Sequence, residues 1–237
     1  MAILNTQAHW LARGIGSSSG TPALLIGVVA MALWFADRQS PPVTMDAGWP
    51  FMLFCLLAVA VGCAALNWVR PQRAGLSPPH VMLSLGFGGM LLGLLADWMH
   101  AGPAQLSSLC QQASARSLAE SFSLHLRYLP GMHIGMLLGG MLAIPSLRML
   151  RSHCGRYLCS VLTQNLLCSG WMLLGMTLGA VWLVRLQIAL GAPSLTGMLG
   201  GMFVGMTWGM VGSVALYRQY FAFRNRASPA SANGDHR

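Results

Sequence analysis

Six long apolar runs constrain this chain more than any other feature of its sequence. A helix needs roughly 20 predominantly apolar residues to cross about 30 Å of hydrocarbon, and lipid offers no water to satisfy an open backbone. The runs lie at residues 21–36, 49–69, 81–100, 130–149, 161–184 and 195–217, the first being the shortest. The sequence therefore predicts an all-α polytopic membrane protein, with about six transmembrane helices in a bundle and both termini on one side.

The charges agree with this interpretation and predict an orientation. Only 8% of the 237 residues are charged and 55% are hydrophobic, which excludes an ordinary soluble domain. The net charge of +9 comes from Arg residues clustered between the apolar runs, as in membrane loops rather than nucleic-acid-binding surfaces. Of the 14 basic residues, Arg38, Arg116, Arg127 and Arg185 lie on one face and the others on the opposite face. The positive-inside rule predicts a bacterial inner-membrane protein with both termini in the cytoplasm.

The segments around the apolar runs have different compositions. Residues 1–20 are polar and are expected to form a cytoplasmic N-terminal segment before the transmembrane domain, residues 21–217. Within 101–129, apolar residues recur at helical spacing, which predicts a short helix lying in the outer membrane interface. These residues are Leu106, Leu109, Ala113, Phe122, Leu126 and Leu129. Residues 218–237 are expected to be a cytoplasmic tail that is largely disordered.

The last apolar run contains the stretch GMLGGMFVGMTWGM, in which Gly precedes Met at every fourth residue. Gly197, Gly201, Gly205 and Gly209 form a small-xxx-small ridge, the pattern that lets helices approach closely in lipid. We expect this ridge to pack against a neighbouring helix, a second copy of the chain or a membrane-protein partner. The adjacent ridge of Met198, Met202, Met206 and Met210 is interpreted first as flexible packing, with a path for a soft metal ion as the alternative.

Other repeated elements resemble this ridge. Gly131, Gly135 and Gly139 have the same spacing in the fourth run. The tetrapeptide MLLG recurs at 90–93, 136–139 and 172–175, which suggests that the last four spans form related hairpins. The cysteines show no CxxC pair, and Cys55, Cys63 and Cys168 are expected to be small buried residues of the apolar runs.

The candidate site lies where the third run ends and the fourth begins. Asp97 is the only carboxylate inside the six runs, and intramembrane ionisable groups are functional candidates. We expect it to meet other metal-ligating side chains at one membrane level, namely His100, His125, Met132, His133 and Met136. Imidazole, carboxylate and thioether together match copper, whereas zinc does not use thioethers.

Two alternatives use the same residues differently. His100 and His133 could cap helix ends at the polar interface, with Asp97 paired to Arg127 or hydrogen-bonded to neighbours of Trp98. Paired His residues could also ligate a b-type haem. The functions that follow are handling or transport of a transition metal ion, copper being favoured; a non-enzymatic assembly subunit that docks another membrane protein; or a small haem electron-transfer subunit. No nucleophile, phosphate-loop or dinucleotide motif supports an enzyme, and a non-enzymatic role is favoured.

Overall fold

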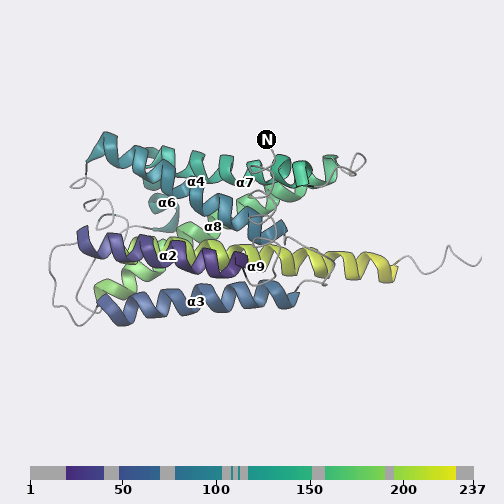
Figure 1. The fold of residues 1–237 in the computed structure, drawn as a ribbon, viewed down its shortest axis with the longest axis horizontal. Helices are drawn as coiled ribbons and strands as arrows, with labels where there is room; N and C mark the ends of the chain where they lie inside the picture. The colour runs from purple at the N-terminus through teal and green to yellow at the C-terminus, as the bar shows by residue number, and fades with distance from the viewer. Residues whose placement is uncertain are drawn as a thin grey trace, which may run out of the picture.

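The computed structural model describes residues 20–39, 48–69, 78–102, 108, 112, 117–150, 158–189 and 195–227. Within these ranges the chain is all-helical (Figure 1). The helices are α2 (Gly20–Gln39), α3 (Gly48–Val69), α4 (Pro78–Ala101), α6 (Leu118–Tyr128), α7 (Pro130–Leu150), α8 (Leu158–Ala189) and α9 (Leu195–Ala227). Residues 218–227, expected to belong to a disordered tail, form the end of α9. The expectations for residues 1–19 and for the tail after Ala227 lie outside the described residues.

The helices α2, α3, α4, α8 and α9 are long and apolar enough to cross a membrane. The chain is therefore a multi-pass membrane protein by helix length and hydropathy. The sequence predicts six spans, but the apolar stretch of α7, Pro130–Ala143, is shorter than the others among the described residues. The sixth span thus remains a prediction, although α7 as a helix continues to Leu150.

Glycines join α4 and α7 along their length. A Cβ atom at Gly89 would strike the carbonyl oxygen of Gly135, and one at Gly93 would strike that of Gly131. One turn further, Gly139 meets the carbonyl of Leu85. The backbones touch at steps of four residues, so that α4 and α7 form an antiparallel pair in which only Gly fits at the crossing points.

A second pair, α8 and α9, repeats this arrangement. Gly175 meets Gly205, Gly179 meets Gly201, and Gly209 meets the carbonyl of Trp171. The antiparallel direction and the four-residue step match those of α4 and α7, which supports the prediction of related hairpins. The Gly ridge of α9 is therefore used inside the chain. α8 lies against Gly201, Gly205 and Gly209, and Gln187 lies against Gly197, so the neighbour of this ridge within the chain is α8. Docking of a second copy or another protein through these glycines stays a prediction.

The opposite face of α9 packs on α2 and α3, and Figure 1 shows α9 running beside both. Here the contacts involve side chains. Cys55 lies against Gly200, Thr207 lies against Gly62, and the indole Nε1 of Trp208 donates a hydrogen bond to the Ala58 carbonyl at 3.2 Å. Because α9 contacts α8 on one face and α2 and α3 on the other, it forms the centre of the bundle.

The predicted outer helix is confirmed over Leu118–Tyr128 as α6, while Leu106, Leu109 and Ala113 lie outside the described residues. A capping box starts α6: the Ser117 side chain accepts from the Glu120 N–H at 3.4 Å, and Glu120 accepts from the Ser117 N–H at 3.0 Å. One face of α6 is buried against α7 and α8. Its position at a membrane interface remains a prediction.

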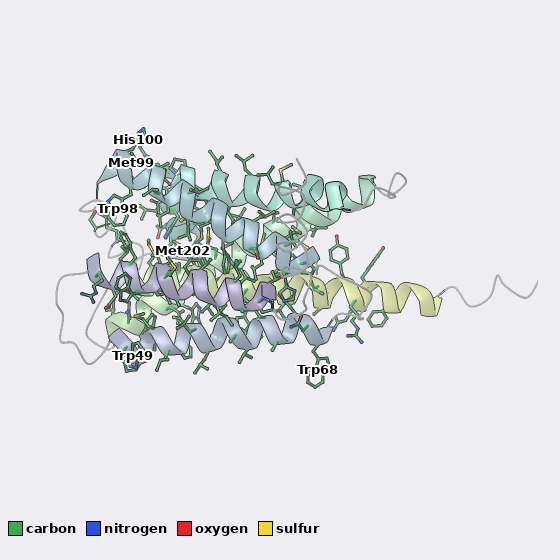
Figure 2. The ribbon with its side chains drawn as sticks, in the orientation of Figure 1. Trp49, Trp68, Trp98, Met99, His100 and Met202 are labelled. Atoms are coloured by element: carbon green, nitrogen blue, oxygen red, sulfur yellow. The ribbon has the colours of Figure 1, made fainter. Side chains whose placement is uncertain are left out.

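Tryptophans lie at the ends of the long helices. Trp49 and Trp68 project outward from the two ends of α3 (Figure 2), and the side chain of Trp68 is 87% exposed. Trp34 and Trp182 are also exposed, whereas Trp98 is partly buried and packs against Phe35 with ring centroids 6.1 Å apart. Exposed indoles at helix ends are typical of headgroup-level anchors.

Candidate metal site

Asp97 connects α4 to the start of α7. Its Oδ1 accepts a hydrogen bond from the Gly131 N–H at 3.0 Å, and its Oδ2 accepts one from the Met132 N–H at 2.8 Å. These N–H groups belong to the first turn of α7, where no intrahelical acceptor exists. Leu129, the residue before the helix, has no side-chain acceptor to cap them. The carboxylate of α4 therefore acts as the N-cap of α7, and its charge lies at the positive end of the helix dipole.

Gly131 makes this close approach possible, because a Cβ atom there would lie only 2.6 Å from Asp97 Oδ1. Both carboxylate oxygens have backbone partners, and in the described part of the chain Asp97 forms no ion pair with Arg127. Asp97 thus has a structural role, the capping of α7, that neither the metal-site prediction nor the predicted pairing with Arg127 included.

His100 does not join the predicted cluster. Its side chain is exposed, and Figure 2 shows His100 and Met99 pointing away from the helices at the end of α4. The ring Nδ1 lies 3.0 Å from the carbonyl oxygen of Ala96 in the same helix. Asp97 and His100 are three residues apart and were expected on one face, but Asp97 faces α7 while His100 faces away from it.

His125 and His133 are both buried and lie close enough to interact electrostatically. His133 Nδ1 lies 2.8 Å from the Leu129 carbonyl oxygen, and His125 Nδ1 lies 2.7 Å from that of Ser121. Because a carbonyl only accepts, each Nδ1 carries the proton, and each Nε2 of a neutral ring presents its lone pair. This is the arrangement by which proteins orient metal-ligating imidazoles.

The Nε2 atom of His133 has no hydrogen-bond partner, although the side chain is only 3% exposed. The ring of Phe122 stands edge-on to it, with centroids 6.4 Å apart. Phe122 and His125 come from α6, so that α6 covers this part of α7. A buried polar atom without a partner costs about 1–3 kcal/mol, which favours a ligand at this nitrogen.

Burial keeps His125 neutral. Desolvation lowers the pKa of His125 below its ordinary value of 6.5; the hydrogen bond to the Ser121 carbonyl opposes this effect, and nearby His133 adds to it. An imidazole must be neutral to bind a metal. His125 is therefore ready to act as a ligand at neutral pH.

Met132 and Met136 are completely buried, one turn apart on α7. They belong to a larger set of methionines from α4, α7, α8 and α9 that share one hydrophobic core and are at most 1% exposed, with Met202 visible inside the bundle in Figure 2. This set comprises Met90, Met132, Met136, Met172, Met176, Met198, Met202, Met206 and Met210. We call it the methionine core. Sequence spacing found the α9 ridge but not the convergence of four helices.

The described residues contain no group of three or more His, Cys, Asp or Glu side chains able to hold a metal ion. A metal at this site would therefore need thioethers beside the two imidazoles. No family model matches the chain, and comparison with curated proteins and with solved structures finds no significant match.

Proposed function

We propose that this multi-pass membrane protein binds and handles a soft transition metal ion, with Cu(I) favoured. The observation that carries the proposal is the buried, partnerless Nε2 of His133. Its Nδ1 is engaged by the Leu129 carbonyl, which fixes the ring and leaves Nε2 as the ligating atom. His125 supplies a second imidazole with the same backbone support.

The methionine core favours Cu(I) over other ions. Imidazole and thioether together suit reduced copper, whereas Zn²⁺ prefers thiolate, imidazole or carboxylate. Met132 and Met136 are the thioethers on the helix of His133 and are the proposed further ligands. Asp97 acts as a positioning residue, because it anchors the first turn of α7, from which both Met132 and His133 project.

The other two functions have less support. A docking subunit would need an accessible Gly ridge, and that of α9 is covered by α8. A b-type haem would need two axial imidazoles on opposite sides of a macrocycle, whereas His125 and His133 lie on neighbouring helices beside Phe122. A Soret band in the purified protein would favour haem and contradict the copper proposal.

The test is anaerobic titration of metal-free protein in detergent with Cu(I) against a competing chelator. His133→Ala should weaken Cu(I) binding by about tenfold or more, because it removes a first ligand. His100→Ala is the matched control, since it removes an exposed imidazole from the same end of the α4–α7 pair. Equal affinities for wild type and His133→Ala would overturn the proposal.

A further inference from the structure

A second set of sulfur and hydroxyl groups lies in the same core, between α8 and α9. The Cys168 Sγ and Ser213 Oγ atoms are 3.0 Å apart and hydrogen-bonded, and both side chains are buried. Met172 is one helical turn from Cys168 on α8, and Met210 is three residues before Ser213 on α9. Each pair shares a helix face, because residues three or four apart are neighbours on a helix.

Two glycines of the other hairpin pack closely against these side chains. A Cβ atom at Gly140 would lie 3.1 Å from Ser169 Oγ and 3.7 Å from the Met172 Cε methyl. A Cβ atom at Gly86 would lie 3.6 Å from Met206 Cε and 3.9 Å from Met172 Sδ. The thioether of Met172 therefore lies where α4, α7 and α9 meet α8.

Ser169 gives an independent sign of a ligand here. Its hydroxyl has no hydrogen-bond partner, although the side chain is only 2% exposed. The Ser169 hydroxyl and the Met172 methyl both lie within 4 Å of the Cβ position of Gly140. Buried hydroxyls are normally satisfied by protein or ordered water.

We propose a second soft-metal site in this half of the core, with Cys168, Met172 and Met210 as ligands to Cu(I) and Ser169 and Ser213 as supporting hydroxyls. The cysteine binds as thiolate, so that binding releases one proton from Sγ to solution. Thiolate and thioether are both soft ligands that select Cu(I). The inference rests on the proposed function, because it gives the same ion a second binding position.

The two sites are distinct along the bundle. His133 is seven residues from Gly140 on α7, which corresponds to about 10 Å of helix rise. Met136 lies between His133 and Gly140 on α7, and Met206 of α9 lies near Met172 at the Gly86 position.

The experiment counts bound ions in the full chain in detergent, with Cu(I) under anaerobic conditions and Ag(I) as a redox-stable probe. We expect wild type to bind two ions, Cys168→Ser one, His133→Ala one, and the double variant none. The ultraviolet charge-transfer absorption of a Cu(I)–thiolate should persist in His133→Ala and disappear in Cys168→Ser. Cys63→Ser, which changes a buried cysteine of α3, is the matched control and should bind both ions with the absorption unchanged.

The outcomes separate the two proposals. Wild type with a single ion that is lost in His133→Ala but kept in Cys168→Ser would overturn the second site and leave the proposed function in place. A single ion that is lost only in Cys168→Ser would support the second site and overturn the histidine site. Met172→Leu, which nearly preserves volume, provides a further variant if Cys168→Ser misfolds. Retention of both ions in Met172→Leu and Cys168→Ser would overturn the inference.

Discussion

At the scale of single residues, Asp97 shows how one carboxylate can organise a helix pair. Its two oxygens replace the missing acceptors of the first turn of α7, and its charge complements the helix dipole. A carboxylate close to the membrane is costly unless it is fully hydrogen-bonded. The cap removes that cost and fixes where α7 begins relative to α4.

We predict that Asp97→Ala lowers stability by about 2 kcal/mol, in the range for hydrogen bonds to a charged group. Asp97→Asn should lose less, because one acceptor oxygen remains. Thermal unfolding in detergent, followed by circular dichroism, measures the effect. Asp37→Ala, which removes an exposed carboxylate from α2, serves as the control. Unchanged unfolding of Asp97→Ala would show that the cap contributes nothing to stability.

The lowered pKa of buried His125 leads us to predict that the stability of the metal-free protein depends on pH. Burial lowers its pKa in the folded state below the ordinary 6.5. Well above pH 6.5, His125 is neutral in both the folded and the unfolded protein, and its contribution to the free energy of unfolding is fully present. As the pH falls below 6.5, the unfolded state takes up a proton first, so that stability decreases until the folded pKa is reached.

Melting temperatures measured across this interval test the effect. His125→Leu should flatten the decline below pH 6.5, whereas His100→Leu, at an exposed position, should keep it. If both variants show the wild-type slope, another group is responsible for the pH dependence.

At the scale of helices, glycine crossings decide which helices pair. At Gly205 a Cβ atom would collide with the Gly175 carbonyl, which is backbone and cannot rotate away. Gly212 is on the same helix and has nothing within 4 Å of its Cβ position. These two glycines differ in their contacts, although both lie in α9.

We therefore predict that Gly205→Ala destabilises the α8–α9 pair, while Gly212→Ala is neutral or stabilising by up to about 1 kcal/mol through helix propensity. Thermal unfolding and the yield of monodisperse protein measure both effects. Similar behaviour of the two variants would mean that the close crossing does not determine pairing.

The methionine core offers a contrasting test on the same helix. Met206→Leu nearly keeps volume and apolarity, so that folding should be preserved with a cost below about 1.5 kcal/mol. Since Met206 is not among the proposed ligands, both bound ions should also remain. Loss of metal with intact folding would instead place Met206 in a metal site.

At the scale of the whole molecule, two glycine-joined antiparallel pairs enclose the methionine core, and α2 and α3 cover the far face of α9. The long apolar helices imply contact with lipid around the bundle. The number of spans fixes whether the two ends of the chain share a side of the membrane.

The Arg distribution predicts that they do. A reporter active only in the cytoplasm should be active when fused after Arg226 and inactive when inserted near Ser114, a position outside the described residues. The control is the same reporter fused to a protein of known orientation. Equal activity at both positions would mean that an even number of spans separates them, and would contradict the predicted odd number. Reversed activity would mean that the predicted orientation is wrong.

The sequence alone determined the helices. Apolar runs of this length must satisfy their backbone within a helix, and the runs predicted at 49–69 and 130–149 differ by at most a few residues from α3 and α7. The Gly ridges also followed from the sequence, because a four-residue step defines a face of a helix whatever packs on it. The imidazoles and thioethers of the proposed metal site were also predicted from the sequence, and metal binding there stays a prediction.

Only the tertiary structure decided which neighbour each face meets. Periodicity orients a side chain about its own helix axis but does not say which helix lies opposite, since that depends on how all the helices pack together. For this reason the sequence did not predict that the Gly ridge of α9 packs against α8 or that Asp97 caps α7. It also did not predict that the side chain of His100 is exposed while that of His133 is buried. The partnerless Nε2 of His133 and the gathering of Cys168 with Met172 exist only because several helices exclude water from one core.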